Sequence, residues 1–340
     1  MFSILNSIKV ENMALLEVKN LEVSFALPHG DLVALDDVSF TLDKKERLGV
    51  VGESGAGKSV TGFAVINLIS KPGKITQGEI LFEGQRLDTL SESEMRHIRG
   101  NRISMIFQDP MMTLNPVLTI GTQMVETLQA HRKISRKEAE KIAIQKLELV
   151  HIPSPERRLS QYPHEFSGGM RQRIIIAIAL ITDPSIIIAD EPTTALDVTI
   201  QAEIMELLQE LCASEDMGLM LITHDLGVVA EVTERVMVMY AGKVIEMAKT
   251  RDLVAKPLHP YTIGLINALP GHGSCDTKNR LQQIPGSMPN LTEIAPGCSF
   301  HPRCDRCQDL CKREVPKLRQ LKGYEGRLVS CHFAEQESAE

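Results

Sequence analysis

The clearest chemical pattern in the sequence is a glycine-rich loop at residues 52–59, GESGAGKS, which directly follows the apolar run LGVV. The loop fits the spacing G-x-x-x-x-G-K-[ST]. Glycines let backbone N–H groups curl around phosphates, and the helix expected next points the positive end of its dipole at them. In such a loop Lys58 reaches the β- and γ-phosphates, and the Ser59 hydroxyl ligates Mg²⁺. The sequence therefore predicts a nucleotide phosphate site. Its residues are Gly52, Glu53, Ser54, Gly55, Ala56, Gly57, Lys58, Ser59 and Val60.

Two further apolar runs end in residues that could act on a bound nucleotide. Asp190 and Glu191 follow the first run, and His224 follows the second. Ligands of open parallel sheets bind at the carboxyl ends of strands, so these side chains are expected near the phosphate loop. We expect Asp190 to hold Mg²⁺, Glu191 to orient or deprotonate an attacking water, and His224 to contact the γ-phosphate. Singly, each could be a helix cap or a structural residue. Together with the loop they indicate a nucleotide hydrolysis site.

Five of the seven cysteines crowd into residues 298–331. Four thiolates would suit a zinc ion, but the spacings are not the paired C-x₂-C units of zinc ribbons. The run Cys304-x₂-Cys307-x₃-Cys311 echoes part of a ferredoxin motif. Buried thiols without a metal are the remaining interpretation, and disulfides are disfavoured in the cytosol. The five cysteines are Cys298, Cys304, Cys307, Cys311 and Cys331.

Composition limits the possible classes of protein. The net charge of −7 and the pI near 5.9 argue against a nucleic-acid binder held by a basic face. No apolar run approaches the ~18 residues of a membrane helix, and the N-terminus lacks the pattern of a secretory signal. These features predict a cytosolic location. Residues 1–13 are expected to be a loose leader, with Met13 as an alternative start.

The surrounding pattern predicts an α/β protein with a mostly parallel sheet. Alternating residues over 15–42 indicate antiparallel strands before the phosphate loop, and residues 89–165 have helical periodicity that indicates an inserted helical subdomain. Residues 250–340 are richer in Pro, Gly and Cys and are expected to form an appended domain. The other expected elements are helices at 58–68, 174–182 and 200–211, strands at 186–189 and 219–223, and hairpins at 76–88 and 236–246.

Several motifs follow the phosphate loop in a specific order. They are Gln108 within IFQDP, FSGGM at 166–170, Ala195-Leu196-Asp197, and His224. In this order, over about residues 14–250, the chain resembles the ATP-binding subunit of an ABC transporter. The resemblance implies a P-loop NTPase (RecA-like) α/β core with an antiparallel β subdomain and a helical subdomain at about 89–168, followed by a small Cys-rich extension at 251–340.

The resemblance also assigns roles to these motifs. Phe25, which by itself fits edge packing as well, is expected to stack on adenine. Gln108 would sense Mg²⁺, and Asp197 would belong to the D-loop. Two such domains bind two ATP molecules head-to-tail, so the signature residues Ser167, Gly168 and Gly169 would serve the site of the other domain. A helix start suits a γ-phosphate presented in this way.

The signature points to one branch of the family. FSGGMRQR is typical of peptide and nickel importers, which pair two different ATPase chains, and its Met170 resembles the first of the pair. HPYT at 259–262, GCSFHPRC at 297–304 and SCHF at 330–333 resemble the C-terminal region of this branch. By resemblance, Cys298, Cys304, Cys311 and Cys331 would bind a 4Fe–4S cluster, with zinc as the alternative and Cys307 spare.

The implied complex contains a second ATPase chain, two transmembrane permease subunits and, indirectly, an extracytoplasmic substrate-binding protein. The chain would act peripherally on the cytoplasmic face of the inner membrane, without nucleic acid. Residues 109–122 would dock a permease helix, and Met111, Met112, Leu114 and Val117 there fit core or partner contacts equally. The alternatives are import of nickel or another small solute, or a soluble ABC ATPase acting on nucleic acid or ribosomes. A single cassette, no long coiled coil and an acidic charge oppose the last.

Overall fold

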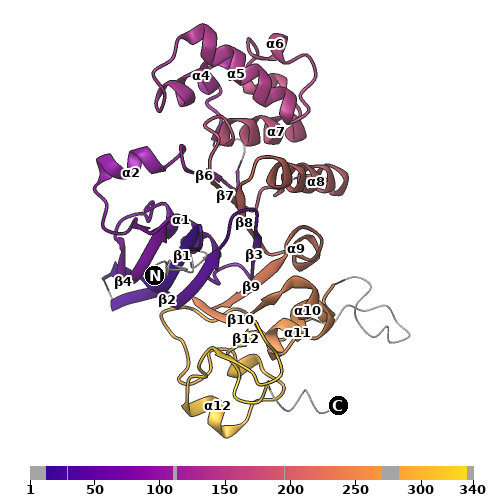
Figure 1. Cartoon of the computed structure of the whole chain (residues 1–340). Helices are drawn as coiled ribbons and strands as arrows, with labels where there is room; N and C mark the ends of the chain where they lie inside the picture. Colours follow the sequence, from indigo (N-terminus) through magenta and orange to yellow (C-terminus); the bar gives the residue numbers. More distant parts are fainter. Residues whose placement is uncertain (1–12, 29, 110–112, 195, 270–282, 335–340) are drawn as a thin grey trace, which may run out of the picture.

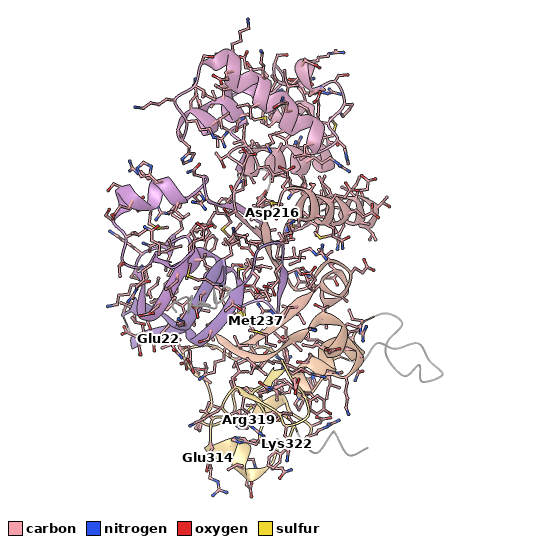
Figure 2. The ribbon with its side chains drawn as sticks, viewed as in Figure 1. Glu22, Asp216, Met237, Glu314, Arg319 and Lys322 are labelled. Carbon is pink, nitrogen blue, oxygen red and sulfur yellow. The ribbon has the colours of Figure 1, made fainter. Side chains whose placement is uncertain are left out.

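The computed structural model describes residues 13–28, 30–109, 113–194, 196–269 and 283–334. A group of helices, α4 to α7, lies at one end of the molecule, and the C-terminal segment with α12 lies at the other (Figure 1). Two β-sheets lie between them. Met237 in the buried core lies near the middle of the molecule, whereas Glu314 and Lys322 lie on the C-terminal segment (Figure 2). The expected leader falls almost wholly outside the described residues.

The first sheet is antiparallel, with strand order β2-β1-β4-β5, as expected before and after the phosphate loop. The separate short strands expected over 15–42 are two long strands in the structure. A bulge at Asn20, where φ is +46°, shifts the register of β1 and made its two halves look separate. The strands are β1 (Leu16–Leu27), β2 (Gly30–Leu42), β4 (Gly73–Phe82) and β5 (Gln85–Arg86).

The second sheet has the order β11-β12-β10-β9-β3-β8-β7-β6. Strands β9, β3, β8, β7 and β6 are parallel neighbours, which confirms the α/β core. All residues of β7 and β8 are buried, because both faces of a parallel sheet are covered. The strands are β3 (Arg47–Val51), β6 (Ile103–Ile106), β7 (Ile186–Asp190), β8 (Gly218–Thr223), β9 (Arg235–Tyr240), β10 (Lys243–Lys249), β11 (Arg319–Gln320) and β12 (Leu328–Val329).

Alternate side chains of the central strands pack into two separate hydrophobic cores. On β7, Ile186 and Ile188 pack with the antiparallel sheet and α1, whereas Ile187 and Ala189 pack with α7, α8 and α9. Strand β6 lies within the stretch 89–168 that was expected to be helical. Its four residues, ISMI, are too short a run to stand out among charged neighbours, so the sequence pattern concealed a strand of the central sheet.

The helices cover the sheets and build the two ends of the molecule. Among the described residues, none of them combines the length and the apolar character needed to cross a bilayer. The helices are α1 (Lys58–Val65), α2 (Glu92–Ile98), α4 (Ile120–Gln129), α5 (Arg136–Leu149), α6 (Pro155–Arg158), α7 (Gly168–Ala179), α8 (Val198–Ser214), α9 (Leu226–Val232), α10 (Thr250–Ala255), α11 (Pro260–Asn267) and α12 (Asp309–Arg313), with single 3₁₀ turns η1 (Pro163–Glu165) and η2 (His301–Arg303).

The C-terminal extension continues the central sheet. Strand β12 pairs with β10, and β11 pairs with β12, both antiparallel. The fully buried carboxylate of Glu246 on β10 accepts the backbone N–H groups of Leu258 and His259, each at 2.9 Å, and contacts Arg327 at 3.2 Å. A buried carboxylate that lies before position 251 therefore holds residues that lie after it.

Candidate functional site

The phosphate loop runs from the end of β3 to the start of α1, at the carboxyl edge of the parallel sheet. Two of its glycines are required by close packing. A Cβ at Gly52 would lie 2.3 Å from the carbonyl oxygen of Met239, and Gly57 has φ of +102°, with its Cβ position 2.7 Å from Leu35. The Nζ of Lys58 donates to the carbonyl oxygens of Gly52 and Glu53 at 2.8 and 3.0 Å. These contacts curl the loop into a cradle for phosphates.

Burial changes the acid–base properties of the loop lysine and of the neighbouring aspartate. Desolvation lowers the pKa of Lys58, opposed by the carboxylates of Glu191, Asp190 and Glu53. Desolvation raises the pKa of Asp190, whose side chain accepts the Ser59 hydroxyl at 3.0 Å. A hydroxyl and a carboxylate meeting at the end of the loop form an oxygen ligand set of the kind that Mg²⁺ prefers. The structure thus brings together Ser59 and Asp190, two of the three residues predicted to hold the ion; the third, Gln108, donates to Glu191.

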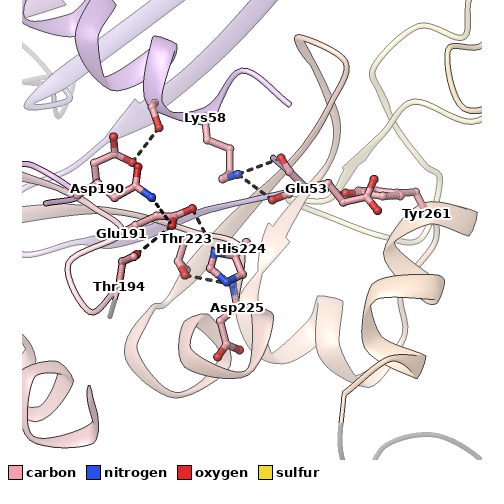
Figure 3. A network of polar contacts seen from close by, with 12 residues as sticks. Glu53, Lys58, Asp190, Glu191, Thr194, Thr223, His224, Asp225 and Tyr261 are labelled. Carbon is pink, nitrogen blue, oxygen red and sulfur yellow. Dashed lines mark hydrogen bonds and ion pairs between the residues drawn. The ribbon is translucent and has the colours of Figure 1, made fainter. Parts of the chain in front are cut away.

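Glu191 is the centre of the polar network beside the loop (Figure 3). Its Oε2 accepts the Gln108 amide and the Thr194 hydroxyl, each at 3.1 Å, and its Oε1 lies 3.1 Å from Nδ1 of His224. Three motifs that are far apart in the sequence therefore meet on one carboxylate. Glu191 itself has φ of +46°, an unusual backbone conformation that is typical of functional sites. No sequence motif pointed to Thr194, which reaches the carboxylate through a tight local turn.

A cavity of about 430 Å³ lies over the phosphate loop, within the range of nucleotide-sized pockets. Phe25 lines it together with loop residues and two members of the network. Leu291, from the C-terminal extension, also lines it and was not predicted, because the irregular segment around it has no periodic pattern. The lining residues are Phe25, Leu27, Leu32, Ala34, Ser54, Gly55, Gly57, Lys58, Ser59, Val60, Gln108, Glu191 and Leu291.

The signature residues lie away from this cavity. Ser167 caps α7, accepting the N–H of Met170 at 3.3 Å, and Gly168 and Gly169 form the first turn of that helix. Asp197 caps α8 by accepting the N–H of Ile200 at 3.0 Å. Each thus has a local structural role in this chain, and the roles across a domain interface stay predictions. Ala195 lies outside the described residues.

Four cysteines surround a second cavity, of about 190 Å³, in the extension. Cys298, Cys304, Cys311 and Cys331 line it, and Cys307 does not. The described cysteines are free thiols, and burial raises the pKa of Cys298 and of Cys304 to about 11. Within the described ranges, no three His, Cys, Asp or Glu side chains are arranged to hold a metal ion. The structure therefore gathers the four predicted ligands around one space without arranging them as a site for a metal ion.

The geometry is that of a nucleoside triphosphatase, and comparison with known proteins agrees. The family model described as ABC transporter matches residues 35–194, and the model described as oligopeptide/dipeptide transporter, C-terminal region, matches residues 245–311. The cassette in the dimeric structure of MJ0796, a bacterial ABC transporter cassette, is 30% identical with a TM-score of 0.62, over 69% of this chain and 99% of that one. A second structure of that cassette is bound to ADP and Pi.

Curated relatives extend the similarity over nearly the whole chain. The oligopeptide transport ATP-binding protein OppD of Salmonella typhimurium is 47% identical over 93% of each chain. AppD of Bacillus subtilis, also an oligopeptide transport ATP-binding protein, is 47% identical over 96% of this chain and 98% of its own. The chain therefore belongs to the ATP-binding proteins of ABC transporters, in the group that has the oligopeptide/dipeptide transporter C-terminal region. It is an ABC-type ATPase.

Proposed function

We propose that this chain is the ATP-hydrolysing subunit that powers peptide import through an ABC transporter. The observation that carries the enzymatic part is the carboxylate of Glu191, held by Gln108 and His224 beside the Ser59–Asp190 pair. The relatives named above are oligopeptide transport proteins, which favours peptides over nickel as the substrate. The C-terminal match to the oligopeptide/dipeptide transporters supports the same branch.

In the proposed mechanism, the loop N–H groups and Lys58 bind the phosphates of ATP, and Phe25 packs against the adenine. Ser59, Asp190 and Gln108 would hold Mg²⁺, which would neutralise phosphate charge. Glu191 accepts a proton from water as that water attacks the γ-phosphorus, the bond to ADP breaks, and phosphate leaves. His224, 66% exposed at its side chain, orients Glu191 from the open side of the site and contacts the γ-phosphate.

The second half of each ATP site comes from another cassette in this proposal. The helix start at Ser167, Gly168 and Gly169 faces a different ATP from the one on this chain's own loop, and Asp197 lies at the same interface. Met170, where the family usually has Gln, supports a partner that is a second, different ATPase chain. An isolated chain is then expected to hydrolyse ATP slowly.

The chain would work peripherally, on the cytoplasmic face of the membrane, against two permease subunits. Leu114 is 3% exposed and belongs to the core, whereas Val117 is 75% exposed and fits a partner contact. Met111 and Met112 lie outside the described residues. The surface at residues 109–122 is therefore the proposed docking face, with Val117 as its exposed apolar contact.

The cysteine cavity is proposed to hold a 4Fe–4S cluster on Cys298, Cys304, Cys311 and Cys331. A single zinc ion would draw four sulfur atoms to within ~3.8 Å of one another, given zinc–sulfur bonds of ~2.3 Å. Thiols spread around a cavity of about 190 Å³ suit a larger group better. The cluster would have a structural or sensory role, because ATP hydrolysis needs no redox step.

The test uses the chain co-expressed with the second ATPase, both permeases and the binding protein, in proteoliposomes. Peptide uptake should require ATP. Glu191→Gln should keep ATP binding and slow phosphate release by about a thousandfold, the scale of general-base catalysis. Glu206→Gln, on the exposed face of α8, is the matched control and should hydrolyse normally. Hydrolysis by Glu191→Gln at the wild-type rate would contradict the assignment of the base.

A further inference from the structure

The C-terminal extension makes polar contacts with Glu53 of the phosphate loop. The hydroxyl oxygen of Tyr261 on α11 accepts the backbone N–H of Glu53 at 2.9 Å. The guanidinium of Arg303 on η2 forks the carboxylate, with Nη1 2.6 Å from Oε2 and Nη2 3.0 Å from Oε1. Both the backbone and the side chain of Glu53 are thus held by residues more than 200 positions away in the sequence.

Arg303 is itself fixed in place before it reaches Glu53. Its side chain is only 5% exposed, and its Nε donates to the carbonyl oxygen of Pro285 at 2.8 Å. The guanidinium lies 5.8 Å from the ring centroid of Tyr240 and 6.0 Å from that of Phe300. Because the planar guanidinium is already held by these contacts, it loses little conformational entropy when it pairs with a carboxylate. The contact with Glu53 is therefore preorganised.

The position of Glu53 gives this pair a consequence for nucleotide binding. The carbonyl oxygen of Glu53 accepts a hydrogen bond from the Nζ of Lys58, and Lys58 is the residue that must reach the phosphates. A carboxylate without a counter-charge on the same loop would also repel a polyanion such as ATP. Arg303 therefore does two things for the loop. It holds the side chain of Glu53, whose carbonyl oxygen accepts a hydrogen bond from Lys58, and it cancels a negative charge next to a phosphate site.

We infer that Arg303 is a positioning residue for ATP binding, which acts through Glu53 and makes the affinity of the phosphate loop depend on the C-terminal extension. The inference rests on the phosphate loop as the ATP site. It does not depend on the transported substrate or on the contents of the cysteine cavity.

The first measurement is the Kd for ATP with Mg²⁺, by equilibrium titration of the full-length chain. Arg303→Ala should raise the Kd about tenfold, within the usual range of coupling between sites. Arg303→Lys keeps the charge but loses the fork, and should raise the Kd about threefold. Arg313→Ala, an exposed arginine on α12, is the matched control and should bind ATP like the wild type.

A double substitution separates the charge effect of Arg303 on the loop from damage to the fold. Glu53→Gln combined with Arg303→Ala removes both charges, so it should bind ATP more tightly than Arg303→Ala alone. Damage to the fold of the extension would instead persist or worsen in the double variant. The inference is overturned if Arg303→Ala or Arg303→Lys binds ATP like the wild type, or if the double variant shows no recovery. If Arg303→Ala does not fold, the Kd for ATP of Arg303→Lys provides the test.

The assembled transporter gives the second readout. Arg303→Ala should raise the KM for ATP by a similar factor and leave kcat within about twofold, because saturating ATP compensates for a weakened loop. A lower kcat with an unchanged KM would overturn the inference. Failure of peptide import by the wild type would count against the proposed function alone, since the titration of the chain does not involve transport.

Discussion

Glu246 on β10 joins the extension to the central sheet, and its replacement by alanine has a consequence that can be worked out. The carboxylate is fully buried, and its partner Arg327 is only 7% exposed at the side chain. Glu246→Ala leaves that guanidinium inside the protein without its carboxylate, and it removes the acceptor of two backbone N–H groups, those of Leu258 and His259.

Removing one partner of a buried ion pair costs about 3–5 kcal/mol. We take about 4 kcal/mol, because burial raises the pKa of Glu246 and so cancels part of the gain from the charged pair. For a chain of 340 residues, an unfolding entropy of about 2.1 cal/mol/K per residue amounts to roughly 0.7 kcal/mol/K. Glu246→Ala should then lower Tm by about 6 °C.

Calorimetry gives the Tm, and hydrogen exchange shows where the structure loosens. Backbone amides of β12 and α11 should exchange faster in Glu246→Ala, whereas those of β7 should change little. Glu325→Ala removes an exposed glutamate from the same extension and should leave both readouts unchanged. A Tm within about 1 °C of the wild type, with β12 still protected, would refute the role given to Glu246.

Two further predictions concern the extension. Burial lowers the pKa of His259 to about 3 in the folded protein, whereas in the unfolded chain the imidazole takes up a proton near pH ~6.5. Below that pH the unfolded state therefore binds more protons than the folded state, and acid favours unfolding. Stability should therefore fall by about 1.4 kcal/mol per pH unit from this group below pH ~6.5. His259→Asn, which keeps a cap acceptor, should flatten the slope of urea-unfolding free energy between about pH 6.5 and 5, and equal slopes would refute the assignment. On the proposal that the cavity holds a 4Fe–4S cluster, Cys307→Ser should keep iron and sulfide in the anaerobically purified chain and Cys311→Ser should lose them, since Cys311 lines the cavity and Cys307 does not; equal loss in both would make Cys307 a ligand.

Much of the nucleotide site could be predicted because its parts are local patterns with fixed chemistry. The phosphate loop needs glycines and Lys58 at set spacings, and acidic or basic residues at strand ends must meet at one sheet edge. Glu191 and His224 were identified in this way, and the structure brings them to 3.1 Å. The gathering of four cysteines, by contrast, was anticipated from the family resemblance, and their spacing alone left zinc and cluster open.

The contacts that could not be predicted are made by irregular segments that pack against residues far away in the sequence. Glu53 and Arg303 are 250 positions apart, and η2, which holds Arg303, has no periodicity to reveal which way it points. Leu291 reaches the nucleotide cavity from a segment of the same kind. Strand β6 was missed for a different reason, since four residues, three of them apolar, carry too little pattern between polar stretches.

The pairing of β12 on β10 also affects how the protein behaves in solution. An edge strand of a sheet has a row of unpaired backbone groups that can pair with another chain and start aggregation. Here β12 pairs with Glu246 and Met247 of β10, and the edge of the sheet passes to β11, which has two residues, Arg319 and Gln320, both exposed. A very short, polar edge strand is a poor template for further strand pairing. The extension thus covers part of this edge, and truncation before β11 would leave the backbone groups of β10 at Glu246 and Met247 without their β12 partners.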